Sequence, residues 1–198
     1  MRSIHFIAGI VTCSVFCTGN LLAQEKATGP VVLKLVSKQD RYVFDGGGKS
    51  PKEFKEHLEE IAKRLGAGQD VRPPKPQSVD LVLQLQNISK EKVTVYVGGD
   101  SNVYTFDLSG GAGVVTMNNP VAFTADFRLP KAVEIEPGKA YEIPVKVFAD
   151  GNRGFSRLVF WTGPGEYKLV ARYTLADMDG GKVAELKSEP ITIKVNDK

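Results

Sequence analysis

The stretch VDLVLQLQN, residues 79–87, alternates apolar and polar side chains with a period of two. This period is typical of an antiparallel strand that buries one face and exposes the other. The buried face is predicted to carry Val79, Leu81, Leu83 and Leu85. The same alternation recurs in residues 93–97, 104–108, 141–147, 167–173 and 191–195. Most of the chain after residue 78 is therefore predicted to form strands.

Short clusters of turn residues separate these strands, as in GGDSN at 98–102, EPGK at 136–139 and TGPG at 162–165. Strands that each have one apolar face need an opposing sheet, so the pattern predicts a sandwich of two antiparallel sheets. A parallel α/β sheet is disfavoured, because it needs a helix between successive strands and the gaps after Asn87 are too short to hold one. Residues 31–38 and 41–44 are also predicted to be strands of this sandwich.

One helix is predicted at about residues 50–66, ahead of the main run of strands. Ser50 can cap its first turn, Pro51 suits the first helical position, and Glu53 completes a capping box. Its narrow apolar stripe consists of Phe54, Leu58, Ile61 and Leu65. We expect this helical insertion to lie against the sandwich and to cover one open end. A proline-rich connector, residues 71–77, then leads into the next strand.

Residues 1–23 have the layout of a secretory signal peptide, with Arg2, an apolar run, and small or polar residues before Ala23. The apolar run is too short to span a bilayer, which disfavours an uncleaved anchor. Cys13 and Cys17 both lie inside this segment, and neither has the flanking residues of a lipoprotein signal. Cleavage after Ala23 would leave a protein without thiols or disulfides. We therefore expect one secreted or periplasmic domain that spans residues 24–198.

The charge balance gives no reason to expect a nucleic-acid partner or, once the signal segment is removed, membrane insertion. The formal net charge is +3 for the whole chain, and it falls to +2 when Arg2 leaves with the signal segment. Lysines and glutamates are interspersed, so no basic patch is predicted for nucleic acid or for an anionic membrane surface. The remaining chain, about 175 residues, is long enough for one domain with its own core. We expect a monomer without a cofactor.

Three features resemble parts of catalytic or ligand-binding motifs. Gly46-Gly47-Gly48-Lys49-Ser50 precedes a helix as a phosphate loop does, yet Val43 stands where that loop needs its first glycine. Gly154-Phe155-Ser156-Arg157-Leu158 lacks the second glycine of a nucleophile elbow. His57, the one histidine after residue 23, lies on the charged face of the helix, where we expect it to be solvated. No catalytic residue and no enzyme activity are predicted.

Two acidic turns, at residues 150–152 and 177–180, offer oxygen atoms that suit calcium, but neither has the full calcium-loop pattern. Aspartate and glycine are common in hairpin turns, so no metal site is predicted, and a weak calcium site stays open as an alternative. Asn87-Ile88-Ser89 fits a glycosylation sequon, although it lies where a turn would use the same residues.

Several structural motifs are shared with a known class of domain. They are LVLQLQNISKEKVTV at 81–95, LSGGAGV at 108–114, EPGKAYEIPV at 136–145, FWTGPGEYKLVARYTL at 160–175 and SEPITIKV at 188–195. Together they resemble the immunoglobulin-like (Ig-like) domains of small secreted bacterial proteins of unknown function. The resemblance covers residues 79–195 and implies an Ig-like antiparallel β-sandwich. A weaker resemblance, which supplies no inhibitory loop, is to the β-sandwich proteinase inhibitors of bacteria.

The segment from Gly165 to Leu169 is similar to the part of immunoglobulin domains that carries the tyrosine corner. The resemblance implies that Tyr167 anchors the start of its strand through its hydroxyl group. Leu169 stands where those domains have a cysteine, so the inter-sheet disulfide is not implied here.

Taken together, the sequence predicts an all-β protein, an Ig-like antiparallel β-sandwich with one inserted α-helix. Its expected role is an exported, non-catalytic binding or structural module of the cell envelope, with a protein or carbohydrate as partner. Two alternatives are a β-sandwich proteinase inhibitor and a hydrolase with an unrecognised carboxylate site. The candidate ligand contacts, all from loops or strand ends, are Asp100, Asn102, Asn152, Arg153, Arg157 and Trp161. For Trp161 a place in the core is the competing expectation.

Overall fold

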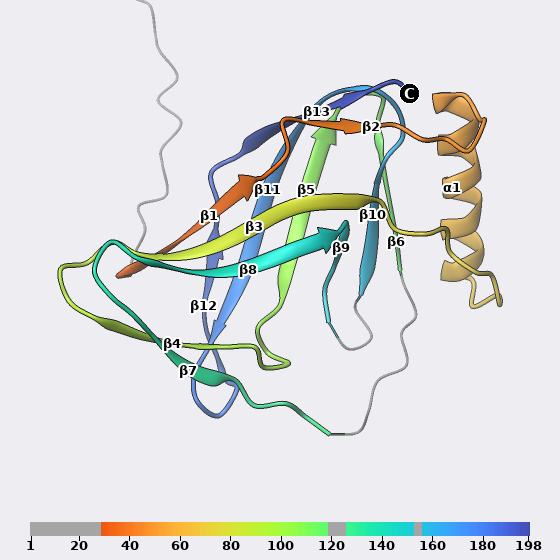
Figure 1. Cartoon of the computed structure of the whole chain (residues 1–198). Coiled ribbons are helices and arrows are strands. Elements are labelled where there is room, and N and C mark those ends of the chain that lie inside the picture. Colours follow the sequence, from red (N-terminus) through yellow and green to blue (C-terminus); the bar gives the residue numbers. More distant parts are fainter. Residues whose placement is uncertain (1–28, 119–125, 153–155) are drawn as a thin grey trace, which may run out of the picture.

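The computed structural model describes residues 29–118, 126–152 and 156–198. It is mostly β structure, with one helix at the side of the strands (Figure 1). The predicted signal segment, residues 1–23, lies outside the described residues. Among the described residues no helix has the length and apolarity needed to cross a membrane.

The stretch VDLVLQLQN, residues 79–87, lies at the centre of one sheet. The strand β3 (Ser78–Asn87) pairs with β1 (Val31–Ser37) along one edge and with β8 (Ala140–Val147) along the other, both antiparallel. Leu81, Leu83 and Leu85 are fully buried, which confirms the predicted apolar face.

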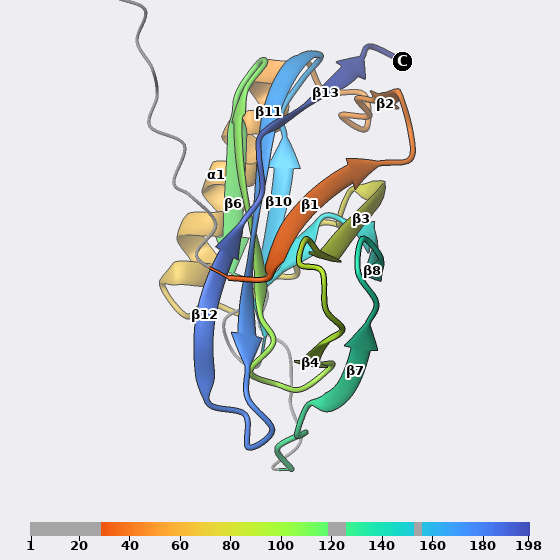
Figure 2. The ribbon, with the colours of Figure 1, turned by 90° about the vertical axis from the view of Figure 1, so that its left-hand side faces the viewer.

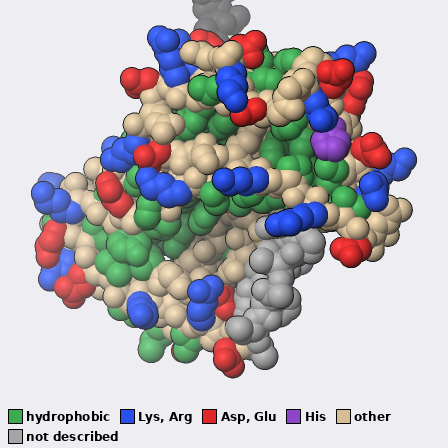
Figure 3. All heavy atoms as spheres, turned by 45° about the vertical axis from the view of Figure 1, so that its right-hand side comes forward, with side chains coloured by type: hydrophobic (Ala, Val, Ile, Leu, Met, Phe, Trp, Pro, Cys, Tyr) green, Lys and Arg blue, Asp and Glu red, His purple; other side chains and the backbone are tan. Residues whose placement is uncertain are grey.

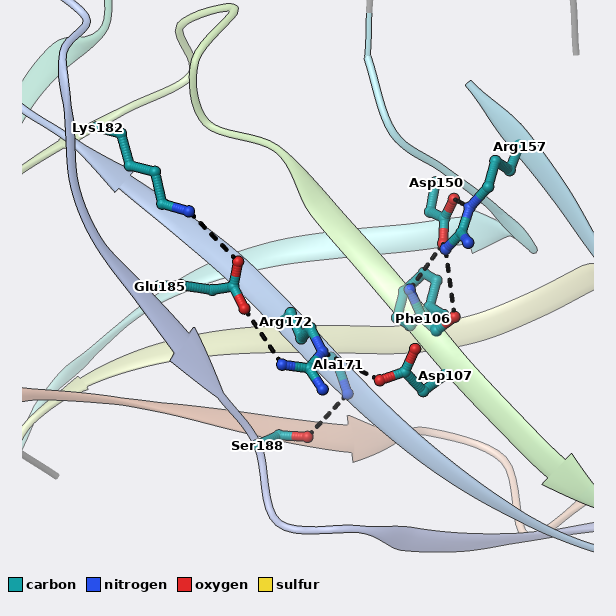
Figure 4. A network of polar contacts seen from close by, with 9 residues as sticks. All are labelled: Phe106, Asp107, Asp150, Arg157, Ala171, Arg172, Lys182, Glu185 and Ser188. Carbon is teal, nitrogen blue, oxygen red and sulfur yellow. Dashed lines mark hydrogen bonds and ion pairs between the residues drawn. The ribbon is translucent and has the colours of Figure 1, made fainter. Parts of the chain in front are cut away.

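A second layer is built on the longest strand, β11 (Gly165–Ala176). The strand β5 (Tyr104–Gly110) pairs along one edge of β11, and β13 (Ile191–Asn196) and β12 (Lys182–Lys187) share the other edge in succession. Ser188 bridges the break between β12 and β13. Its backbone N–H donates to Ala171 O at 2.9 Å, and its Oγ accepts from Ala171 N at 2.9 Å (Figure 4).

Three further strands complete this layer. The strand β2 (Arg41–Val43) runs parallel to β13, which differs from the purely antiparallel sandwich we expected. The strand β4 (Val93–Val97) meets the end of β11 at one residue pair and also pairs with β7 (Lys131–Ile135). The apolar faces of the two layers enclose one core cluster. Figure 2 shows the two layers from the side.

A third, small sheet was not predicted. It consists of β6 (Val114–Asn118), β10 (Arg157–Trp161) and β9 (Ala149–Asp150). Its presence follows from β10, in which Leu158, Val159, Phe160 and Trp161 are all buried. A strand that is apolar on both faces needs cover on both sides. Val159 and Trp161 face the main core, and Leu158 and Phe160 belong to a second cluster.

The helix α1 (Pro51–Gly66) covers that second cluster. Ser50 caps it as predicted: Ser50 N donates to the Glu53 carboxylate at 2.9 Å, and Glu53 N donates to Ser50 Oγ at 3.4 Å. Leu58 and Ile61 are buried against β6 and β10. We expected the helix to cover an open end of the sandwich. It lies instead on a sheet face, because the outer side of β10 is apolar (Figure 1).

Tyr167 is fully buried and its hydroxyl group is bonded twice. The hydroxyl donates to Gly163 O at 2.7 Å and accepts from Ala112 N at 3.2 Å. The first bond reaches back four residues, so the predicted anchoring of the strand through Tyr167 is confirmed. Gly111 lies directly on the ring: a Cβ there would be 2.2 Å from Tyr167 Cζ, so only glycine fits.

Replacing Leu58 by Ala should lower the free energy of unfolding by about 2 to 5 kcal/mol, because Leu58 is fully buried between α1 and the small sheet. Urea denaturation measures this loss. Glu60→Ala, an exposed change on the same helix, is the control and should cost less than about 0.5 kcal/mol. Equal losses from the two variants would show that the stripe of α1 is not packed against β6 and β10.

Tyr167→Phe should lower the free energy of unfolding by about 1 to 3 kcal/mol, because Gly163 O and Ala112 N lose a buried partner. The matched control is Tyr141→Phe on β8, whose hydroxyl forms no hydrogen bond within the described part of the chain. Thermal or urea unfolding of both variants measures the difference. A Tyr167→Phe protein as stable as the control would show that the hydroxyl bonds contribute nothing.

Candidate functional site

Several loops meet at one end of the sandwich, the lower end in Figures 1 and 2. We call this region the loop end and define it as residues 98–103, 126–130, 150–152 and 177–181. Hydrogen bonds join its parts: Asp100 N donates to Arg128 O at 2.9 Å, and Ser101 Oγ donates to Gly180 O. A Cβ on Gly99 would lie 2.6 Å from Pro130 N, so two of these segments are in close contact.

Asp100, one of the predicted contacts, lies inside the loop end. Its side chain is 2% exposed and binds Arg128 through Oδ1, at 2.8 Å from both Nε and Nη2. Its Oδ2 accepts from Arg128 N at 2.9 Å. We expected Asp100 to be available to a ligand, but its carboxylate is enclosed and serves the loop itself. Burying a charge requires such a partner, and sequence alone did not identify Arg128.

The side chains of Asn102 and Asn152 also form hydrogen bonds to backbone groups of neighbouring segments. Asn102 accepts from Gly99 N at 2.9 Å and donates to Tyr96 O at 3.0 Å. Asn152 donates to the backbone carbonyl oxygen of Asp100. The structure therefore brings three of the predicted residues together, as a framework for the loop end. Arg153 lies outside the described residues.

Arg157 forms a two-pronged ion pair with Asp150, a fully buried carboxylate. Arg157 Nε donates to Oδ1 at 2.9 Å and Nη2 to Oδ2 at 2.7 Å, while Phe106 N also donates to Oδ2 at 2.7 Å (Figure 4). The bond to Asp150 raises the pKa of Arg157 above its usual value. The Arg157 guanidinium is bound to Asp150, which in turn accepts a hydrogen bond from Phe106 of β5. Arg157 therefore links β9 and β5, and its role here is structural.

Trp161 lies in the main core, 2% exposed, which agrees with the competing expectation for this residue. Its ring packs on Tyr42 and Phe148, with centroids 5.3 Å and 5.7 Å away. Its backbone is bound by the Gln77 side chain through two hydrogen bonds, of 2.9 and 3.0 Å. Trp161 therefore presents no ring face to a sugar or peptide.

Three of the exposed side chains of the loop end are large and apolar. Leu129 is 57% exposed, Met178 is 62% exposed and Phe127 is 52% exposed. One edge of the Phe127 ring lies beside Gly180, where a Cβ would be 3.0 Å away, so the segments that carry Phe127 and Met178 adjoin. Exposed apolar side chains gathered among polar ones mark interaction surfaces. Sequence reasoning missed these residues, because an isolated apolar residue in a loop predicts nothing by itself.

In the acidic turn at residues 177–181, the Asp177 carboxylate binds backbone N–H groups of the turn itself. Asp177 Oδ1 accepts from Asp179 N at 3.0 Å and from Gly181 N at 2.7 Å. Within the described residues no group of three His, Cys, Asp or Glu side chains is placed to hold a metal ion. Asn87, in the sequon, is fully buried and donates to Glu91 O and Ile135 O, so its amide is not available for glycosylation.

Comparison with known proteins adds no assignment. No protein-family model matches the sequence, and a search of curated proteins finds no match.

Asp150→Asn should lower the free energy of unfolding by about 2 to 4 kcal/mol, because it leaves a partly buried Arg157 without its counter-charge. The matched control is Asp107→Asn, which removes a surface ion pair with Arg172 and should cost less than about 1 kcal/mol (Figure 4). Urea denaturation of both variants tests the contrast. Equal losses would contradict a structural role for the Asp150–Arg157 pair.

Proposed function

We propose that this protein is an exported, non-catalytic Ig-like module that binds a partner protein through its loop end. The Ig-like assignment is supported by strand pairing. The order β1-β3-β8 corresponds to strands A, B and E of an immunoglobulin domain, and β5, β11 and β12–β13 correspond to C, F and G. Tyr167, at the start of β11, occupies the place of the tyrosine corner.

The observation that carries the binding role is the exposure of Leu129, Met178 and Phe127 on a loop end whose polar groups are bound to each other. A rigid support lowers the conformational entropy lost when a partner binds. Methionine, aromatic residues and arginine are enriched in protein interfaces, and Arg128 lies among these side chains with its own side chain 73% exposed. A protein suits this surface better than a carbohydrate, since the one tryptophan is buried.

A binding role also agrees with the state of the two buried carboxylates. Asp100 and Asp150 are each held by an arginine and a backbone N–H. A general acid or base needs a carboxyl group that is accessible to substrate and has a pKa near the working pH. These two side chains stabilise loops, which favours recognition over hydrolysis. Export is supported by the pattern of residues 1–23.

The test is capture from the envelope fraction of the native host with immobilised protein and two variants. Leu129→Asp places a charge in the apolar surface and should weaken retention of a captured protein at least about tenfold. Ile88→Asp, at an equally exposed apolar residue in the β3–β4 turn, is the control and should retain the same protein. Loss of capture with Ile88→Asp as well, or capture unchanged by Leu129→Asp, would reject the loop end as the binding surface.

A further inference from the structure

A groove lies away from the loop end, at the upper right of Figure 1, between the turn after β2, the start of α1 and the proline-rich connector. It encloses about 280 Å³ and is lined by basic side chains, Lys49, His57 and Lys75, above an apolar base. Phe54, Pro74 and the largely buried Phe160 form that base. Figure 3 shows the one described histidine at the surface, beside hydrophobic side chains and with both basic and acidic side chains nearby.

The walls of the groove are held in place from behind. Phe44 packs edge-on against Phe54, with ring centroids 5.5 Å apart, and this contact holds the turn against α1. Gln77 is bound to the backbone of Trp161 by two hydrogen bonds, and Phe148 N donates to Gln77 O at 2.8 Å. These bonds attach the connector to the core. The walls of the groove are therefore fixed by contacts within the protein.

The charges that line the groove are unbalanced. Within the described part of the chain neither Lys49 nor Lys75 forms an ion pair. The acidic side chain in the lining, Asp45, already binds Lys198 at 3.0 Å and accepts from Gly47 N at 2.9 Å. Glu53, on the first turn of α1, is bound by Ser50, so the helix terminus is already capped. Lys49 also interacts electrostatically with Glu53, and the groove presents its positive charge mainly through Lys49 and Lys75.

We propose that this groove binds a small organic anion. Its carboxylate or phosphate group lies between Lys49, Lys75 and His57, and its apolar body rests on Phe54 and Pro74. Charge-assisted hydrogen bonds from lysine hold the anionic group, and burial of the apolar body against the ring adds to the affinity. The site is separate from the loop end, so it does not depend on a protein partner.

The test follows the imidazole Hε1 resonance of His57 by NMR, identified by its loss in His57→Gln. The probes are benzoate and phenyl phosphate, with inorganic phosphate as the anion that has no apolar body. We expect a saturable shift with at least one organic anion, with a Kd on the order of 1 mM, and weaker binding of inorganic phosphate. The tighter of the two organic probes identifies the preferred anionic group.

Charge-matched variants locate the site. Lys49→Gln and Lys75→Gln should each weaken binding about three- to tenfold, because each removes one charge-assisted bond. Lys52→Gln removes the same charge from an exposed lysine of α1 outside the groove and should leave binding unchanged. A shift that never saturates with either organic anion would overturn the proposal. An equal effect of Lys52→Gln, or equal affinity for inorganic phosphate, would do the same.

Discussion

The packing of Gly111 on the Tyr167 ring determines how three parts of the chain meet. The ring lies under the turn between β5 and β6, and its hydroxyl bonds to Gly163 before β11 and to Ala112 in this turn. Gly165 is also required, since a Cβ there would lie 2.8 Å from the Gly111 Cα atom. No cysteine lies among the described residues, and the apolar side chains that both layers contribute to the main core hold these layers together.

The second constraint is the apolar character of both faces of β10. Its inner face contributes Val159 and Trp161 to the main core, and its outer face requires α1 as cover. With α1 in this position, Phe54 in its first turns packs on Phe44 before the turn after β2. The Gln77 side chain attaches the connector to the backbone of Trp161. The groove is thus a consequence of covering β10. Apart from Phe160 of β10 itself, the residues that line it come from the turn after β2, from α1 and from the connector.

Local patterns predicted much of the fold, and long-range contacts account for what they missed. The alternation in residues 79–87 and the capping box of Ser50 and Glu53 depend on near neighbours, so both are visible in the sequence. The third sheet is not, because β6 and β10 are about forty residues apart and the run from Arg157 to Trp161 suits a core strand of any sheet. The parallel pairing of β2 with β13 is also a contact between residues far apart in the sequence, so local patterns do not predict it either.

The candidate site shows why polar loop residues are poor guides to binding surfaces. A loop that folds back on itself must satisfy its own backbone and its own charges, and Asp100, Asn102 and Asn152 serve those needs. Such residues are needed whether or not the loop binds anything.

The side chains that remain exposed after this internal bonding are the informative ones. At the loop end they include Phe127, Leu129 and Met178, and in the groove they include Lys49 and Lys75, which form no ion pair within the described residues. The exposed apolar side chains of the loop end and the basic side chains of the groove therefore suit two different classes of partner.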